Sequence, residues 1–423
     1  MTSWICAQIG AREHYAVPRA LHQAGRLCGL YTDFWADAVW RKLVAGPASG
    51  PLRSLAARFH NDLADAPVTS WNLRSFSWEA SSRFLSHREG AAGKYKSYLE
   101  TGSRFACAVR DALRRQRNLA PETMFFAYDT GALETLEWIR ERGFRSVLDQ
   151  MDPNRVEVDL VREEEQRWPG WQDGTTEVPE EYFQRREQEW ELADRVMVNS
   201  EFSKRALIAQ GVPPEKLVVV PLCYEGAGSD FRPALRDESM PLRVLWLGQV
   251  ILRKGIQYLL EAARQLAGEK IRFDVVGPIG ISVDAVASAP ANVTFHGRAS
   301  RDQIGEWYAQ ADVFVLPTIS DGFALTQLEA MAHGLPVIAT PNCGDVVRHE
   351  TDGLIIPVRD AQALAKAILR YRLSTELLRN HQAAAPAKAN QFRLAHLAGN
   401  LSGLEVRQPN DDLASNRWIE TYA

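Results

Sequence analysis

The sequence predicts an α/β protein with two doubly wound, Rossmann-like parallel-sheet domains that face each other across a cleft. At 423 residues the chain exceeds the length at which a single core stops growing, so two domains are expected. Strand-like apolar runs alternate with helix-like segments through both halves, an order that favours parallel sheets covered on both faces. A stretch containing several Gly, Pro, Asp and Ser residues, at 226–242, separates the halves as a linker.

The first domain is predicted to comprise residues 1–225. Its short apolar runs bounded by Gly, Pro or Asp read as strands, and its longer periodic segments as helices. The expected strands are 4–9, 123–127, 146–149, 195–199 and 217–221, and the expected helices are 17–24, 132–142 and 204–210.

The second domain is predicted to comprise residues 243–399. The same rules give strands at 243–248, 271–276, 293–296 and 312–317, with helices at 256–266 and 302–309. The tail from about 400 to 423, which includes Trp418 and Tyr422, is expected to pack back on the first domain.

The composition is that of an ordinary soluble protein, with 46% apolar and 24% charged residues. The net charge of −4 argues against a nucleic-acid partner. Five scattered cysteines, an odd number, favour a reducing compartment. The start of the chain reads as a first strand rather than a signal peptide, and no apolar run is long enough to span a membrane. A cytoplasmic location is therefore expected.

Two segments depart from the even mix of charges. Residues 35–118 contain 14 Lys or Arg against 7 Asp or Glu, interleaved with four tryptophans. Solvated helical faces with packed tryptophans would explain this pattern, and so would peripheral contact with anionic lipid or an anionic acceptor at the inner membrane face. Residues 157–191 contain 12 acidic against 4 basic residues and are interpreted as a solvated face.

Two carboxylates lie eight positions apart across a predicted strand-to-helix junction, at Asp321 and Glu329. The strand at 312–317 leads to Asp321 and Gly322, and a helix carrying Glu329 then ends at Gly334. Eight helical residues rotate by about 800°, so the carboxylates would point within about 80° of each other and lie about 12 Å apart along the axis. With helix-start N–H groups between them, this spacing suits an elongated ligand held at two points.

The loop between the strand at 243–248 and the helix at 256–266 contains two adjacent cations, Arg253 and Lys254. Ligands of doubly wound sheets sit beyond the carboxyl ends of strands, where this loop and the Asp321 loop both belong. Arg offers phosphate a planar fork and Lys offers a point charge. Taken alone, the two cations could be a solvated pair on the surface. Taken together with the Asp321 loop, they favour a site for a phosphate-bearing ligand.

Further motifs extend this pattern along the chain. They are Gly248, Arg253, Lys254 and Gly255; Val276, Gly277 and Pro278; Phe295, His296 and Gly297; the run Asp312 to Pro317 with Glu329 to Val337; Asp352, Gly353 and Leu354; and, in the first half, Ala193 to Ser200 with Gly211 and Val212. In this combination, residues 243–360 resemble the donor domain of retaining glycosyltransferases of family 4 (group 1), which have the GT-B fold. About half of the chain is covered.

The resemblance implies a role for each matching residue. Glu329 would hold the ribose hydroxyls of a nucleotide-sugar donor, and Asp321 would lie near hydroxyls of the transferred sugar. Arg253 and Lys254 would neutralise the departing diphosphate, the main catalytic effect. The remaining donor-binding residues implied are Gly248, Gly322, Phe323, Ala324, Leu325, Gly297 and Arg298. No Asp-x-Asp triplet is present, so no metal and no cofactor other than the donor substrate is expected.

Arg298 and His296 follow a predicted strand, where they would either border the nucleobase pocket or form a surface pair. His333 closes a helix, where a cation suits the helix dipole, and it is interpreted as structural.

The chain departs from the family pattern at three places. Asp321 is one methylene shorter than the usual Glu, which leaves the donor sugar and its pose open. Many relatives carry a His after the strand at 146–149, where the nearest match in this chain is Met151 or Gln150. The first loop has one glycine, Gly10, where relatives often have two. Residues expected at the acceptor or phosphate loop of the first domain are Gly10, His14, Asp149 and Asp152, with helix-capping and solvent-exposed roles as the alternatives.

The sequence thus predicts a retaining hexosyltransferase of polysaccharide or glycolipid biosynthesis, with a nucleotide sugar and a saccharide or lipid-linked acceptor as its substrates. Two alternatives remain open. One is a nucleotide-sugar epimerase of the same architecture; the other is a non-catalytic sugar-nucleotide-binding scaffold, which the missing His would allow. A dinucleotide oxidoreductase is disfavoured because neither half has a Gly-x-Gly-x-x-Gly turn after its first strand.

Overall fold

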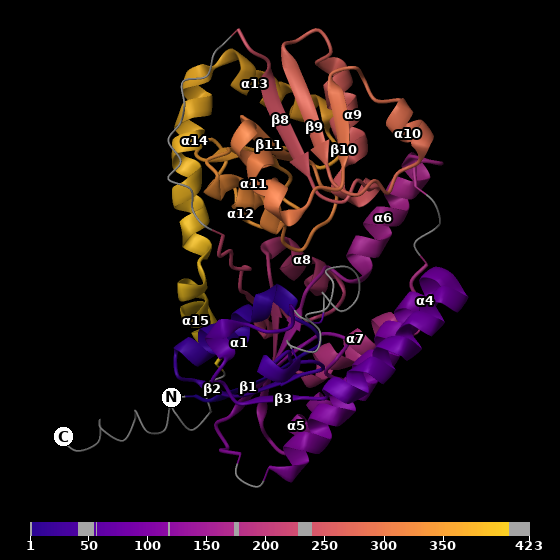
Figure 1. The fold of residues 1–423 in the computed structure, drawn as a ribbon, viewed down its shortest axis with the longest axis vertical. Coiled ribbons are helices and arrows are strands. Elements are labelled where there is room, and N and C mark those ends of the chain that lie inside the picture. Colours follow the sequence, from indigo (N-terminus) through magenta and orange to yellow (C-terminus); the bar gives the residue numbers. More distant parts are fainter. Residues whose placement is uncertain are drawn as a thin grey trace, which may run out of the picture.

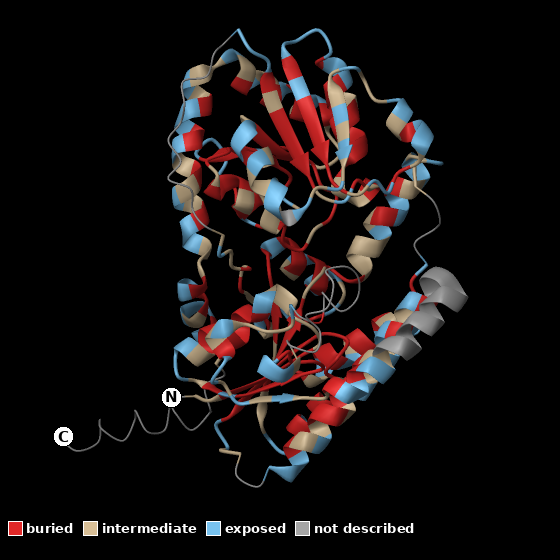
Figure 2. Ribbon diagram, in the orientation of Figure 1, coloured by how far each residue is buried: buried red, intermediate tan, exposed pale blue. Residues whose placement is uncertain are grey.

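The computed structural model describes residues 2–40, 55, 57–116, 119–172, 177–226 and 239–405, without the side chains at 79–92 and 301. Two parallel sheets lie one above the other, each with helices around it (Figure 1). Both sheets are buried along most of their length (Figure 2). The predicted α/β class with two doubly wound parallel-sheet domains is confirmed.

Within the described residues, the first sheet has seven parallel strands in the order β3-β2-β1-β4-β5-β6-β7. The chain reverses its direction of growth between β1 and β4, and at such a switch point the loops after the strands diverge and leave room for a ligand. The strands are β1 Trp4–Gln8, β2 Leu27–Thr32, β3 Val68–Ser70, β4 Met124–Tyr128, β5 Arg145–Gln150, β6 Arg195–Val198 and β7 Leu217–Val219.

The second sheet repeats this topology with six described strands in the order β10-β9-β8-β11-β12-β13. All of its pairs are parallel, and its switch point lies between β8 and β11. The strands are β8 Leu242–Leu247, β9 Ile271–Val276, β10 Val293–Gly297, β11 Val313–Leu316, β12 Val337–Ala339 and β13 Gly353–Ile355.

The described helices around the first sheet are α1 Ala16–Gln23, α4 Asn72–Arg115, α5 Leu133–Glu141, α6 Arg155–Arg167, α7 Glu180–Leu192 and α8 Glu201–Ala209. The described helices later in the chain, after β8, are α9 Ile256–Gln265, α10 Val283–Ala287, α11 Arg301–Gln310, α12 Leu325–Ala332, α13 Ala361–Leu373, α14 Thr375–Ala389 and α15 Leu394–Ser402. Short 3-10 turns occupy Arg12–Tyr15, Asn61–Leu63, Pro214–Lys216, Leu252–Lys254 and Asn390–Phe392.

The end of the described chain returns to the first domain. After α14 runs down the side of the second domain, α15 packs beside α1 (Figure 1). Its apolar face joins the core around β1 and β4 through Leu394, Leu397, Leu401 and Leu404. Residues 406–423, including the tail tryptophan and tyrosine, lie outside the described part of the chain.

The chain therefore crosses between the domains twice, and the two crossings are bonded to each other. The N–H of Tyr224 donates to the carbonyl of Phe392 at 2.8 Å, and Arg393 Nη1 donates to the carbonyl of Gly226 at 2.9 Å. Most of the predicted linker, 227–238, is outside the described residues.

The tryptophans of the basic segment pack inward. Trp35 is buried in the core beside β1, Trp71 and Trp78 pack against the cluster on the opposite face of the sheet, and Trp40 packs against a small apolar cluster. Residues 41–54, 56, 117 and 118 of that segment lie outside the description.

The solvated-face interpretation of residues 157–191 is wrong for part of the segment. Glu164 and Glu189 are both 0% exposed. Each buried carboxylate is stabilised by local partners: Glu189 accepts backbone N–H bonds from Thr130 and Ala132, at 2.6 and 2.9 Å. Burial of a charge is tolerated when hydrogen-bond donors replace its water, which a count of charges does not reveal.

Glu164 on α6 reaches the second domain. It accepts from Gln257 Nε2 at 2.8 Å and from the Tyr258 hydroxyl at 2.9 Å, and it pairs with Arg359 Nε at 2.5 Å. We expect Glu164→Ala to lower the free energy of unfolding by about 3 kcal/mol, because it removes the acceptor of the Tyr258 hydroxyl and the buried carboxylate that pairs with Arg359. Glu163→Ala removes a 52% exposed partner of the same arginine and should cost less than about 1 kcal/mol. Equal losses in chemical denaturation would contradict this assignment.

Candidate donor and acceptor sites

Two loops of the second domain meet at the switch point of its sheet. The N–H of Ile319, after β11, donates to the carbonyl of Arg253, after β8, at 2.9 Å, and the Thr318 hydroxyl donates to the same carbonyl at 3.0 Å. Gly255 lies between them with φ of +75°, and a Cβ there would lie 1.8 Å from the carbonyl oxygen of Pro317. Only glycine fits this close backbone approach, which holds the two predicted loops together.

The cation pair and the first carboxylate of the acid pair are in contact. Lys254 forms an ion pair with Asp321, and Arg253 Nη1 lies 3.9 Å from the same carboxylate. Arg253 Nη1 also donates to the carbonyl of Ser320 at 2.9 Å. Burial alone would lower the pKa of Arg253, but the carboxylates of Glu157 and Asp321 raise it above its usual value. Arg253 therefore stays charged in a partly buried position.

A carboxylate from the other domain is part of this cluster. Glu157 lies on α6, and its Oε2 accepts from the Ser320 hydroxyl at 2.9 Å and pairs with Arg253 Nη1 at 3.3 Å. Burial raises the pKa of Glu157, with Arg253 opposing that rise. The predicted phosphate site is thus already contacted by an acid that the sequence did not mark.

The second carboxylate of the acid pair, Glu329, lies on α12. Its Oε2 accepts from the buried Tyr308 hydroxyl at 2.8 Å, and burial together with Glu329 raises the pKa of Tyr308 well above its usual value. His333 ends this helix, where its Nδ1 lies 2.8 Å from the carbonyl of Glu329 and its ring stacks on Tyr308 with centroids 5.1 Å apart. These contacts agree with a structural role for His333.

The other predicted donor-binding residues lie along the same edge of the sheet. Gly248 follows β8, Gly277 follows β9 and Gly297 ends β10; the N–H of Gly277 donates to the carbonyl of Gly297 at 2.7 Å. Arg298 is exposed at the end of β10. Of the backbone N–H groups predicted to face the donor, that of Ala324 already donates to the carbonyl of Cys343 at 3.0 Å.

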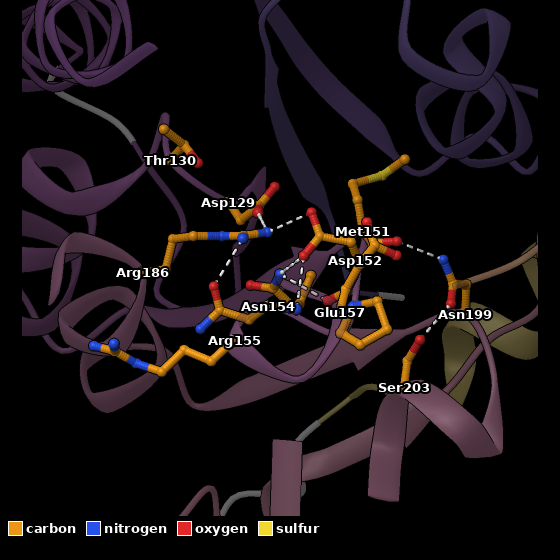
Figure 3. A network of polar contacts seen from close by, with 12 residues as sticks. Asp129, Thr130, Met151, Asp152, Asn154, Arg155, Glu157, Arg186, Asn199 and Ser203 are labelled. Carbon is orange, nitrogen blue, oxygen red and sulfur yellow. Dashed lines mark hydrogen bonds and ion pairs between the residues drawn. The ribbon is translucent and has the colours of Figure 1, made fainter. Parts of the chain in front are cut away.

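The first domain contributes a polar network at the ends of β4 and β5 (Figure 3). The buried guanidinium of Arg186 pairs with Asp129 and, at 2.9 Å, with Asp152, and it donates to Asn154 Oδ1 at 2.8 Å. Burial acts to raise the pKa of Asp152, but Arg186 outweighs it and holds that pKa below the usual value. Asp152 is therefore ionised and engaged in holding the start of α6.

The two domains touch at Met151, one of the two residues predicted to stand where relatives carry a His. The carbonyl of Met151 accepts from Asn199 Nδ2 at 2.8 Å (Figure 3). A Cβ at Gly322 would lie 2.7 Å from that carbonyl oxygen and 2.9 Å from Asn199 Nδ2. Since the loop after β11 fits against this pair only with glycine, Gly322 has a packing role between the domains.

The remaining predicted residues of the first domain have different surroundings. The N–H of Gly10 donates to Asp33 Oδ1 at 2.7 Å, and His14 is exposed. Asp149 is 1% exposed with no hydrogen-bond partner for its Oδ2. Burial, reinforced by Glu13 and Asp129, raises the pKa of Asp149 well above its usual value.

Glu13 gives a testable pH dependence. Its Oε1 is buried without a partner, and burial raises the pKa of Glu13 to about 7 against the lowering effect of Arg12. An acid whose pKa is higher in the folded state than in the unfolded state binds more protons when folded. We therefore expect the contribution of Glu13 to stability to fall as the pH rises from about 4.5 to about 7. The slope of the melting temperature over that range should become less negative in Glu13→Gln and should be unchanged in Glu122→Gln, an exposed substitution.

Two adjoining hollows border this network along α4. One, of about 320 Å³, is lined by Ile9, Arg12, Tyr98, Thr101, Asp129, Thr130 and Tyr182. The other, of about 240 Å³, shares Ile9, Tyr98 and Thr101 with it and adds Asp33, Arg58, Ser75, Trp78 and Ser97. Both cations have carboxylate neighbours: Arg12 lies 3.6 Å from Asp129, and Arg58 pairs with Asp33. The groove therefore offers aromatic faces, hydroxyls and paired charges.

The structure thus brings together Arg253, Lys254 and Asp321, as the sequence predicted. Sequence analysis missed Glu157, Ser320 and Arg186. Their contacts join segments far apart in the chain, and no local spacing marks them.

The second domain matches a known family model. Residues 241–372, less than a third of the chain, match the model described as glycosyl transferases group 1. The amylovoran biosynthesis glycosyltransferase AmsK of Erwinia amylovora is 31% identical over 180 residues, 39% of this chain and 44% of that protein. The colanic acid biosynthesis glycosyltransferase WcaL of Salmonella typhimurium, itself named putative, is 26% identical over 210 residues, 46% and 52% of the two chains. The chain matches about half the length of these relatives.

Solved structures match over nearly the whole chain. TarM has a TM-score of 0.61 at 10% identity, covering 96% of this chain and 99% of that one. Sucrose-phosphate synthase from Thermosynechococcus elongatus has 0.59 at 19%, and Anabaena HepE in complex with UDP has 0.56 at 14%; each match covers 98% of this chain and 100% of the other. At these identities the likeness shows the fold, which is GT-B as predicted.

Two further features concern the described residues as a whole, namely membrane-spanning helices and metal-binding clusters. No helix in that part of the chain is both long and apolar enough to cross a membrane. Nor do three or more His, Cys, Asp or Glu side chains gather there in a way that could hold a metal ion.

Proposed function

We propose that this protein is a glycosyltransferase that moves a hexose-type sugar from a nucleotide-diphosphate donor to an acceptor, with retention of configuration. The observation that carries the proposal is the contact of Arg253 and Lys254 with the Asp321 loop at the switch point of the second sheet. The match to group 1 glycosyl transferases over the same residues supports it.

The two cations would perform the main chemical work. When the bond between the sugar and the diphosphate breaks, negative charge grows on the leaving oxygen, and fixed positive charges nearby lower the barrier. Arg253 can offer two parallel N–H groups to phosphate oxygens, and Lys254 a compact charge. This would make the reaction independent of a metal ion and of any resident cofactor.

Glu329 and the loop before it would orient the donor. A carboxylate accepts two hydroxyl hydrogen bonds at once, which suits the vicinal hydroxyls of a ribose. Gly322, Phe323 and Leu325 would offer N–H groups at the start of α12, where the helix dipole favours an anion. Gly248, Gly297 and Arg298 would border the nucleoside.

The acceptor would bind in the groove along α4 in the first domain, beside the predicted loop residues Gly10, His14, Asp149 and Asp152. Since Arg12 and Arg58 are neutralised by neighbouring carboxylates, the groove favours the hydroxyls of a neutral saccharide end over a bare phosphate. The relatives named for amylovoran and colanic acid biosynthesis support a role in making polysaccharide. We place the reaction in the cytoplasm, and a lipid-linked saccharide would bring the enzyme to the membrane surface.

A thermal-shift screen against nucleotide sugars tests the donor assignment, because a ligand that binds only the folded protein raises its melting temperature. The donor that binds should then give a glycoside with an unchanged anomeric configuration, read by NMR. No shift with any nucleotide sugar would overturn the proposal. An epimer formed without acceptor would identify an epimerase, and donor binding without turnover on any acceptor would identify a scaffold.

A further inference from the structure

Glu157 occupies an unusual place for a residue of the first domain. Its carboxylate contacts Arg253 at 3.3 Å and the Ser320 hydroxyl at 2.9 Å, both in the loops of the proposed donor site. A carboxylate oxygen that accepts from a hydroxyl and a guanidinium makes the same kind of contacts as a phosphate oxygen.

The helix that carries Glu157 is held from both sides. At its start, Asp152 and Asn154 are bonded to Arg186 of the first domain (Figure 3). Further along, Glu164 is bonded to Gln257, Tyr258 and Arg359 of the second domain. The backbone of Glu157 is therefore held in place by the scaffold around it.

The charges of the cluster already balance. Arg253 and Lys254 carry two positive charges, and Asp321 and Glu157 carry two negative ones. A donor diphosphate would therefore meet a site without net charge. Its attraction to Arg253 and Lys254 would be strongest if one of the two carboxylates moved away from them.

We infer that Glu157 is an internal substitute for a donor phosphate, and that binding of the donor diphosphate displaces it from Arg253. This inference rests on the proposed function. It predicts that the wild-type protein binds nucleoside diphosphates more weakly than its cation pair alone would allow.

The test is Glu157→Gln, which keeps the size of the side chain and an oxygen for the Ser320 hydroxyl but removes the charge. Binding of UDP, and of inorganic pyrophosphate as a probe without a base, is measured by calorimetry. We expect the variant to bind both probes about tenfold more tightly than the wild type, because a negative charge close to the bound anion is removed. Higher salt should reduce the difference.

The matched control is Asp159→Asn on the same helix. It removes one negative charge from a side chain that is 65% exposed. That side chain pairs with Arg162, one turn further along the same helix, at 3.5 Å. Its affinity for both probes should equal that of the wild type. Glu157→Asp, which keeps the charge but shortens the reach by one methylene, should fall between wild type and Glu157→Gln, and thermal unfolding checks that all variants fold.

The outcomes separate the two proposals. If Glu157→Gln binds UDP as the wild type does, or more weakly, Glu157 is not a phosphate substitute, although the donor site stands. A loss of affinity for nucleotide sugar with unchanged affinity for UDP would make Glu157 a sugar contact instead. If no variant binds any nucleoside diphosphate or pyrophosphate, the proposed function itself fails.

Discussion

Lys254→Ala is expected to lower kcat/KM by about 10³ without unfolding the protein. The substitution removes the charge proposed to stabilise the departing diphosphate, and loss of one preorganised group of this kind typically costs about 10²–10³ in rate. It also removes the lysine partner of Asp321, which leaves that carboxylate with only Arg253, at 3.9 Å. The measurement is initial-rate kinetics with the donor found in the thermal-shift screen.

The control for this experiment is Lys270→Ala, an exposed lysine of the same domain. It should retain wild-type kinetics, and both variants should melt within a few degrees of the wild type. Near-normal turnover by Lys254→Ala would exclude the lysine from catalysis, and a large fall in both variants would point to a general effect of charge.

The second large effect is expected for Glu329→Gln. An amide accepts hydrogen bonds less strongly than a carboxylate, so the affinity for donor should fall by about 100-fold, on the order of two charge-assisted hydrogen bonds weakened at once. Gln preserves an acceptor for the buried Tyr308 hydroxyl, which Ala would leave unpaired. Calorimetry with the nucleoside diphosphate separates this loss of binding from a loss of chemistry.

Glu306→Gln on the exposed face of α11 serves as the matched control and should bind donor as the wild type does. Unchanged affinity in Glu329→Gln would mean that Glu329 serves the fold through Tyr308 and does not contact the nucleoside.

The strands and the two loops of the second domain could be predicted because their signals are local. The predicted strand at 271–276 coincides with β9, and the run at 312–317 contains β11, since a buried parallel strand reads as a continuous apolar run. That the loops of Lys254 and Asp321 lie together followed from the rule that ligands sit beyond the carboxyl ends of strands, whereas their ion pair was not predicted.

The contribution of α6 could not be predicted in this way. Glu157 and Arg253 are 96 positions apart, and the same acidic run contains Glu163, which is largely exposed, next to Glu164, which is fully buried. Charge counts treat these residues alike. Which of them is buried depends on where the second domain places Arg253 and Arg359, and that placement is a property of the whole fold.

The two crossings between the domains are bonded to each other. Because the N–H of Tyr224 donates to the carbonyl of Phe392, the two connections cannot separate at this point without breaking that hydrogen bond. The ring of Phe323, in the donor loop, lies 6.0 Å from that of Phe392. A donor bound at this loop would therefore lie beside the point at which the two connections between the domains are bonded to each other.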